Sequence, residues 1–302
     1  MNSFPTGTGE RENRSVFPFS YTDGSCPVPL YDDETVEDLQ RDGFRLIQKD
    51  GGFRFGEDSV LLAHHAAAVR LPADLRAVDL GCGCGLIAVM LCALLPGAQV
   101  TGIERLPLAA HAAARNLLLN GLTARARILT GDIRDPGVVK ERDFDLAVCN
   151  PPYLEPGRGA APSDPVRAAA MQEGELTIEE LALAARRLLR PFGTLALVHR
   201  PGRLPDLLQA LRESGLEPRS LREVLPKPGL PASVILVTAV KGARPGGFSI
   251  LPPLVMREPD GRFTYEADAL YGNSQIDPGH LMDGLVRVPG CEEGNVEIGG
   301  VR

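Results

Sequence analysis

The chain lacks any apolar run of the roughly 18 residues that a membrane-spanning helix needs. Its first thirty residues are polar and contain no apolar core of the type found in a secretory signal peptide. These absences predict a cytoplasmic protein with no membrane contact. The 302 residues, 44% of them hydrophobic, suffice for one large domain with extended tails.

Potential metal ligands and disulfide partners are also few. The six cysteines have neither the paired spacing of a zinc ribbon nor the density of a secreted disulfide scaffold. Cys82 and Cys84 form a close pair, but no second pair follows them. The five histidines show no metal-ligand spacing. We therefore expect reduced thiols and no bound metal.

The net charge of −7 is unevenly distributed along the chain. Residues 1–40 carry 2 basic and 8 acidic groups, and residues 251–302 carry 4 and 9. The segment between them, 41–250, carries 26 basic and 22 acidic groups and is therefore net positive. The overall negative charge does not exclude a polyanionic partner such as a nucleic acid.

Short apolar runs alternate with helix-like stretches through the middle of the chain. The runs span 77–80, 99–103, 127–130, 144–149 and 194–198, and the helix-like stretches 86–95, 107–120, 176–189 and 204–213. Such alternation is typical of βαβ units, in which helices cover both faces of a mainly parallel sheet. Two further runs, 217–224 and 232–240, would close one edge. The predicted class is α/β, with a doubly wound, mostly parallel, seven-stranded sheet.

The ends of the chain differ from this core. Residues 1–35 mix Gly, Pro, Ser and Thr with acidic groups, which predicts a disordered acidic tail. The α/β domain is expected over 36–245, a packed extension over 246–272 and a flexible tail over 273–302. Within the domain, residues 58–70 are expected to form a helix with Asp58 as a possible N-cap.

A glycine-rich stretch, DLGCGCG at 79–85, stands directly after a predicted strand and before a predicted helix. Glycine at 81, 83 and 85 allows a sharp turn and the close approach of a ligand to the backbone. No Lys-Ser or Lys-Thr follows, and the motif is shorter than the dinucleotide fingerprint. A nucleoside with a non-phosphate tail therefore fits better than NAD or ATP, although such a turn is also found as a simple tight connection.

Two acidic residues end the next two predicted strands. Glu104 stands where a carboxylate accepts hydrogen bonds from the ribose hydroxyls of a nucleoside, and Asp132 supplies another acceptor on the same rim. Because ligands of open α/β sheets bind at the carboxyl ends of the strands, these turns should converge on one site. An ordinary solvated acid at Glu104 and ordinary turn chemistry at Asp132 are the alternatives.

A third motif, Asn150-Pro151-Pro152-Tyr153, follows the fourth strand of the predicted alternation. The prolines stiffen the loop, which then presents carbonyl oxygens and one side-chain amide. An aromatic or amide NH2 group is a poor nucleophile because its lone pair is delocalised. Acceptors at Asn150 and Pro151 would aim that lone pair at a methyl donor and stabilise the developing positive charge. Tyr153 would stack on a planar substrate. The alternative is a structural turn.

With DLGCGCG, Glu104 and NPPY, the chain resembles the Rossmann-like class I methyltransferases. More narrowly, it resembles the bacterial enzymes that methylate N6 of adenine-37 in tRNA1(Val), through stretches at 51–63, 151–173, 195–201 and 251–272. It departs from that family at 171–173, where members often carry Arg-His-Glu. The resemblance implies S-adenosyl-L-methionine as cofactor and a tRNA substrate. The cofactor-binding residues that it implies, together with those of the motifs above, are Phe55, Gly56, Asp58, Asp79, Gly81, Gly83, Gly85, Glu104, Asp132, Ile133 and Asn150.

Other functions within and outside this class stay open. The glutamine N5-methyltransferases of release factors share NPPY, but their helical domain and Pro-Arg-x-Glu-Thr-Glu stretch are not evident here. Methylation of DNA adenine or ribosomal guanine, and an inactive protein that binds the cofactor and RNA, are further alternatives. No heptad seam indicates a dimer, so a monomer is the default expectation.

Overall fold

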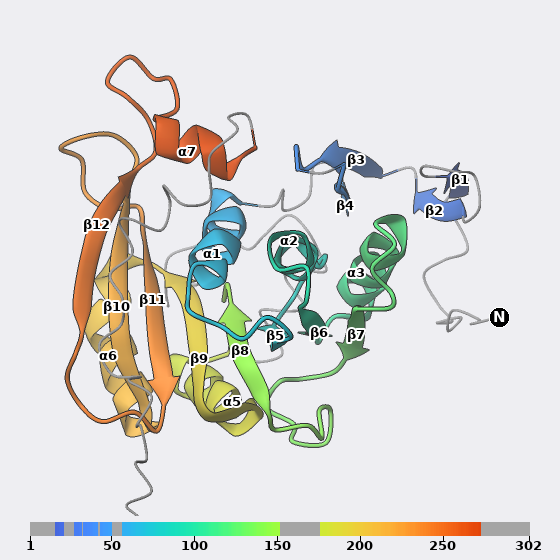
Figure 1. The fold of residues 1–302 in the computed structure, drawn as a ribbon. Helices are drawn as coiled ribbons and strands as arrows, with labels where there is room; N and C mark the ends of the chain where they lie inside the picture. Colours follow the sequence, from blue (N-terminus) through green and yellow to red (C-terminus); the bar gives the residue numbers. More distant parts are fainter. Residues whose placement is uncertain are drawn as a thin grey trace, which may run out of the picture.

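The computed structural model describes residues 16–20, 27–31, 33–41, 43–49, 56–151 and 176–272. Its largest feature is a sheet of eight strands in the order β12-β10-β11-β9-β8-β5-β6-β7 (Figure 1). Five neighbouring strands, from β9 to β7, are parallel, whereas β11 runs antiparallel to both β9 and β10. The strands are β5 (Arg76–Leu80), β6 (Gln99–Glu104), β7 (Ala126–Thr130), β8 (Phe144–Cys149), β9 (Leu189–His199), β10 (Leu216–Leu225), β11 (Val234–Lys241) and β12 (Ser249–Val255).

Helices cover both faces of this sheet (Figure 1). On one face lie α1 (Glu57–Ala67), α2 (Leu86–Leu94), α3 (Pro107–Leu119) and α7 (Tyr265–Leu270), and on the other α5 (Ile178–Leu188) and α6 (Leu204–Glu213). Alternate residues of β9 face opposite cores: Ala196 and Val198 join the α1–α2 cluster, whereas Leu195 and Leu197 join the α5–α6 cluster. This alternation follows from the period of two along a strand. The predicted doubly wound α/β class is confirmed.

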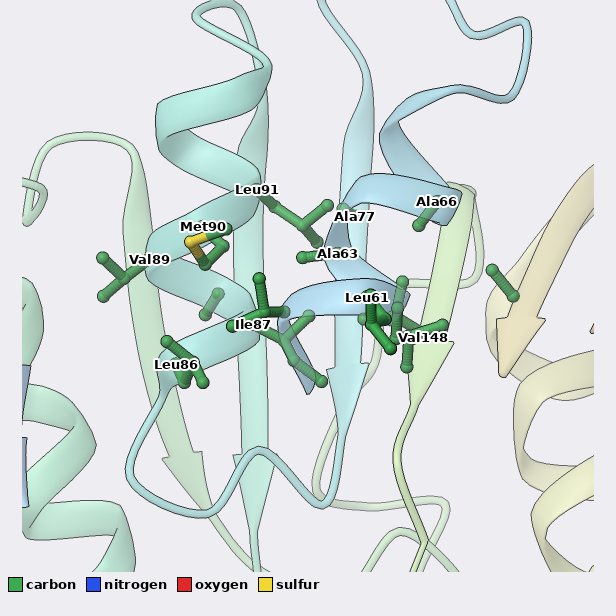
Figure 2. Packing of buried hydrophobic residues seen from close by; sticks show 14 of the residues in the cluster. Leu61, Ala63, Ala66, Ala77, Leu86, Ile87, Val89, Met90, Leu91 and Val148 are labelled. Carbon is green, nitrogen blue, oxygen red and sulfur yellow. The ribbon is translucent and has the colours of Figure 1, made fainter. Parts of the chain in front are cut away.

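The first core is built largely by two helices, α1, which is apolar through its middle, and α2, which is apolar throughout. Figure 2 shows Leu86, Ile87 and Met90 of α2 and Leu61 of α1 packed over the parallel strands, where Val148 of β8 lies. Both helices are buried on most of their surface. The close packing of α1 against β8 fixes the distance between the start of α1 and the carboxyl end of β8. No helix within the described residues is long and apolar enough to cross a membrane.

The sheet has one strand more than the seven expected. β12 pairs in parallel with β10 at the edge of the sheet, inside the segment predicted only as a packed extension. Its sequence, SILPPLV, contains Pro252 and Pro253, which cannot donate to a strand ladder. Prolines are tolerated at an edge, and the register between β10 and β12 shifts at this point. The strand therefore lacks the alternation of apolar and polar residues from which the sequence could have predicted it.

Two expectations about local structure need correction. The helix expected from Asp58 begins at Glu57 and has Gly56 as its N-cap, without a side-chain cap bond, so Asp58 does not cap it. Residues 16–20 and 27–31, expected to belong to a disordered tail, form the paired strands β1 (Val16–Ser20) and β2 (Pro27–Tyr31). Val28 is fully buried against Ile47 and Leu119, which supplies the apolar contact that orders this segment.

A second small sheet follows, made of β3 (Glu34–Asp38) and β4 (Arg45–Lys49) in antiparallel pairing. The amide of Asn116, on α3, holds β4 in place: Oδ1 accepts from the backbone N–H of Ile47 at 2.6 Å, and Nδ2 donates to the Ile47 carbonyl at 2.9 Å. The strand β4 thus packs beside α3 and does not join the large sheet. The tail expected over 273–302 lies outside the described residues.

Candidate active site

The glycine-rich turn between β5 and α2 curls back onto the neighbouring strand. The backbone N–H groups of Gly81 and Cys82 both donate to the carbonyl of Ile103, at 2.9 and 3.0 Å. Gly81 and Gly83 have φ values of 75° and 55°, and a Cβ at either position would meet no atom within 4 Å. The open space beside these two glycines is where a ligand could approach the backbone.

Gly85 ends the same turn but has a different role. Its φ is 85°, and a Cβ there would lie 3.0 Å from the Cβ of Ala113 on α3. The third glycine thus allows α2 to start against α3. The predicted turn geometry is present, with two glycines facing open space and one facing a helix.

Glu104 is fixed to this turn by two backbone hydrogen bonds. Its Oε2 accepts from the N–H of Gly83 at 2.9 Å, and its Oε1 accepts from the N–H of Leu106 at 2.8 Å. Only 8% of the residue is exposed. Each carboxylate oxygen has further acceptor capacity, so the side chain is both held in place and able to bind donors such as a pair of hydroxyls.

Asp79 is a fully buried carboxylate at the end of β5. Neither of its oxygens has a hydrogen-bond partner among the residues that the structure describes. Burial raises the pKa of Asp79 to about 8, and the nearby charge of Glu104 adds to this, against a smaller opposing effect of the Ala88 backbone. A buried carboxylate without a partner is costly and is stabilised by a bound cation. Asp79 therefore fits a positively charged group of a ligand.

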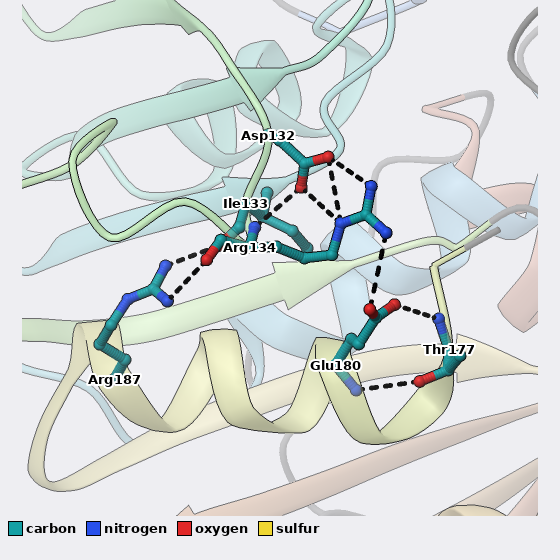
Figure 3. A network of polar contacts seen from close by, with 6 residues as sticks. All are labelled: Asp132, Ile133, Arg134, Thr177, Glu180 and Arg187. Atoms are coloured by element: carbon teal, nitrogen blue, oxygen red, sulfur yellow. Dashed lines mark hydrogen bonds and ion pairs between the residues drawn. The ribbon is translucent and has the colours of Figure 1, made fainter. Parts of the chain in front are cut away.

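The turn after β7 carries Asp132 and Ile133 and is tied to α5 (Figure 3). Both carboxylate oxygens of Asp132 accept from Arg134, with Nη2 at 2.6 Å from Oδ2, and this hydrogen bonding lowers the pKa of Asp132. Arg134 also lies 3.5 Å from Glu180, which forms a capping box with Thr177 at the start of α5.

Arg187, in the last turn of α5, adds a second connection: its Nη2 donates to the carbonyl of Ile133 at 2.6 Å. Ile133 is buried. The rim after β7 is thus held from two points of one helix. The sequence did not indicate this network, although the Thr-x-x-Glu spacing at 177–180 is a recognisable capping signal.

Asn150 and Pro151 follow β8, next to the glycine turn. In the sheet Asp79 is paired with Val148, and the Cys149 thiol lies 3.1 Å from the Leu80 carbonyl, so the ends of β5 and β8 are adjacent. Pro151 is buried and Asn150 half-buried. The structure therefore brings the amide of Asn150 to the same rim as Asp79 and Glu104. Pro152, Tyr153 and Phe55 lie outside the described residues.

The start of α1 reaches the same rim. The Nδ2 of Asn150 donates to the Ser59 hydroxyl at 2.9 Å. Ser59 was not singled out by the sequence, in which it is one residue of the stretch GEDSVLLA. Its neighbour Asp58 is half-buried, and burial raises the pKa of its carboxyl against the opposing charge of Arg200. Gly56 and Asp58 thus lie at the start of α1, within three residues of the Ser59 contact with Asn150.

Among the residues that the structure describes, no group of three or more His, Cys, Asp or Glu side chains could hold a metal ion. Cys82, Cys84, Cys92 and Cys149 are free thiols. Burial raises the pKa of Cys84 to about 11, so this thiol stays protonated at neutral pH.

The parallel sheet with an antiparallel β11 inserted beside β9 is the class I methyltransferase fold, whose enzymes take the methyl group from S-adenosyl-L-methionine. A solved structure described as a predicted O-methyltransferase, Atu636 from Agrobacterium tumefaciens, matches with a TM-score of 0.58 and 27% identity, over 72% of this chain and 98% of that one. The model of the family "Methyltransferase small domain" matches residues 54–211. The chain belongs to the methyltransferase small domain family.

Two curated relatives carry the same name, tRNA1(Val) (adenine(37)-N6)-methyltransferase. The protein of Porphyromonas gingivalis is 38% identical over 170 residues, which make up 54% of this chain and 65% of that protein. The protein of Yersinia pestis is 29% identical over 236 residues, or 73% of this chain and 92% of that protein. The chain thus aligns with just under two thirds of the length of the more similar of the two.

Proposed function

We propose that the protein is an S-adenosyl-L-methionine-dependent methyltransferase that methylates N6 of an adenine in tRNA, at position 37 of a tRNA1(Val)-like substrate. The observation that carries this proposal is the side-chain amide of Asn150 at the carboxyl end of β8, next to the end of β5 that carries the buried Asp79. The names of the Porphyromonas and Yersinia relatives support the choice of tRNA.

The residues at the rim fit the cofactor. Asp79, buried and unpartnered among the described residues, would bind the ammonium of the methionine moiety. Glu104 would accept from the ribose hydroxyls, and the open side of Gly81 and Gly83 leaves room for the ligand beside the backbone. The remaining cofactor-binding candidates, which rest on the resemblance and on the glycine motif, are Phe55, Gly56, Asp58, Gly85, Asp132 and Ile133.

The chemistry required of the protein is mainly positioning. The bound cofactor supplies an electrophilic methyl group. Asn150 Oδ1 and the carbonyl of Pro151 would each accept one N–H of the exocyclic amine, which leaves the nitrogen lone pair free for in-line attack. The same two acceptors stabilise the positive charge that develops on the nitrogen. Pro152 would stiffen the loop, and Tyr153 would stack on the adenine after it leaves its helix.

Action on tRNA would place the enzyme in the cytoplasm, with RNA as its macromolecular partner and the monomer as its default state. A polyanion would approach the segment 41–250, which is net positive although the whole chain is not.

The test is transfer of labelled methyl groups from S-adenosyl-L-methionine to bulk tRNA, with peptide release factor as a competing substrate. We expect label in N6-methyladenosine after nuclease digestion. An Asn150→Ala variant should lose about 100- to 1,000-fold in kcat, as expected for removing one transition-state hydrogen-bond partner. Label in the release factor instead of tRNA would contradict the proposed substrate. Full activity of Asn150→Ala would contradict the mechanism.

A further inference from the structure

Ser59 and Asn150 are 91 residues apart in the sequence but are hydrogen-bonded through their side chains, at 2.9 Å between Nδ2 and Oγ. Ser59 is the third residue of α1 and only 9% exposed. Its backbone N–H donates to the Gly56 carbonyl at 3.1 Å. The hydroxyl is therefore presented by the fixed start of a helix and not by a mobile loop.

This contact determines whether the oxygen or the NH2 group of the Asn150 amide remains free to bind a substrate. An asparagine side chain has one acceptor oxygen and a donor NH2 group, and rotation by half a turn exchanges them. An amine substrate is itself a donor and needs the oxygen. With one N–H of Nδ2 directed to Ser59, the amide oxygen points to the other side, and no described residue donates to it.

The two side chains are held on rigidly connected elements. Leu61 and Ala63 of α1 and Val148 of β8 belong to one buried cluster, which Figure 2 shows between the helix and the strands. Ser59 stands two residues before Leu61, and Asn150 two residues after Val148. The packing of the helix on the strand therefore sets the distance between Oγ and Nδ2.

We propose that Ser59 is a positioning residue for methyl transfer: its hydroxyl accepts from Asn150 Nδ2 and so fixes the amide with the oxygen toward the target amine. Ser59 acts through Asn150 and does not contact the substrate. The inference rests on the proposed methylation of an exocyclic amine and adds to it the group that selects the amide orientation. Preorganisation of this kind removes a rotational cost from each turnover.

The kinetic test compares Ser59→Ala with Ser59→Thr, Asn150→Ala and the double variant Ser59→Ala/Asn150→Ala. Ser59→Ala should lower kcat about 3- to 10-fold, the factor that one net hydrogen bond supplies, and should leave the KM for the cofactor within twofold. Ser59→Thr keeps the hydroxyl and should restore most of the rate. The double variant should be no slower than Asn150→Ala alone, because Ser59 has no function without its partner.

Ser214 provides a matched control, since it is buried to a similar extent and its hydroxyl donates to the Ala210 carbonyl on α6 at 2.7 Å. Ser214→Ala removes a comparable hydrogen bond far along the chain from the loop and should leave kcat unchanged. If Ser59→Ala has wild-type kcat, or if its effect multiplies with that of Asn150→Ala, the proposal is wrong.

A readout independent of activity separates this inference from the proposed function. The side-chain amide of Asn150 gives one pair of proton–nitrogen NMR signals, identified by their loss in Asn150→Ala. One proton of the pair should exchange slowly in the wild type and rapidly in Ser59→Ala. A wild type that shows this protection but does not methylate tRNA would overturn the substrate and keep the positioning contact. Unprotected signals in an enzyme that is active on tRNA would overturn the positioning contact and leave the proposed substrate in place.

Discussion

Arg115, on α3, donates to both carboxylate oxygens of Glu34, on β3, and only 1% and 8% of the two side chains are exposed. The same guanidinium donates to the Pro29 carbonyl at 2.6 Å and lies 4.8 Å from the ring centroid of Tyr31. One buried cation therefore holds two strands of the N-terminal segment, β2 and β3, onto α3. This arrangement explains why part of a segment with tail-like composition is ordered.

Removing the charge of one partner should destabilise the protein strongly. Glu34→Gln leaves the Arg115 guanidinium buried without a counter-charge, which typically costs about 3–5 kcal/mol. Urea unfolding followed by circular dichroism measures the change. The exposed salt bridge between Arg203 and Asp206, at the start of α6, serves as the control, and Asp206→Asn should change stability by less than about 1 kcal/mol. Equal effects of the two substitutions would contradict the structural role given to Arg115.

The glycines of the β5–α2 turn should differ in their response to alanine. Both Gly83 and Gly85 have positive φ, so alanine costs roughly 1 kcal/mol at either position. At Gly85 the new Cβ also lies 3.0 Å from Ala113 Cβ and 3.2 Å from its Cα, whereas at Gly83 it meets nothing. We expect Gly85→Ala to be clearly the less stable variant in thermal unfolding. Gly83→Ala should instead mainly weaken cofactor binding, measured by calorimetry.

The buried carboxylate of Asp79 should make stability fall with rising pH. Its folded-state pKa is about 8 and its unfolded value 3.8, so between these pH values the folded protein binds a proton that the unfolded chain does not. The contribution of this bound proton to stability is complete below pH 4 and is lost as pH rises through 8. Urea unfolding should show that the free energy of unfolding falls less between pH 6 and pH 9 for Asp79→Asn than for the wild type. An identical pH dependence of both proteins would contradict this.

Cofactor binding should release the proton of Asp79. If the carboxyl is protonated in the free enzyme and pairs with an ammonium in the complex, it must ionise on binding. Calorimetry at pH 7 in two buffers of different ionisation enthalpy measures the protons released. Asp79→Asn should bind S-adenosyl-L-methionine more weakly and release fewer protons than the wild type. A variant with unchanged affinity would exclude Asp79 as the ammonium partner.

Two histidines of α1 should destabilise the protein in acid. Burial lowers the pKa of His64 and His65 to about 4 from 6.5, and the Nε2 atoms of both have no partner among the described residues. Their neutral forms support folding above pH 6.5, and this contribution is lost as pH falls toward 4, by up to about 1.4 kcal/mol per pH unit for each group. His65→Leu should flatten the acid limb of a stability profile. His111→Gln, at a half-buried position on α3, is the control.

The sequence by itself determined the class of fold, because the spacing of apolar residues along a segment decides whether that segment forms a helix or a strand. The expected helix at 204–213 matches α6 in full, and the helices expected at 86–95 and 107–120 match α2 and α3 to within one residue. The glycine turn follows from the steric freedom of glycine, which needs no tertiary contact. The order of acidic groups at strand ends follows from the alternation of strands and helices.

Only the tertiary structure decided how these parts act on one another. The pairing of Ser59 with Asn150, the missing partner of Asp79 and the contact of Arg134 with Glu180 depend on which helix packs beside which strand end. The eighth strand, β12, forms because β10 offers an open edge and not because its own residues favour a strand. Spacing along the chain placed the candidate groups on one rim, whereas burial and packing set their charge states and orientations.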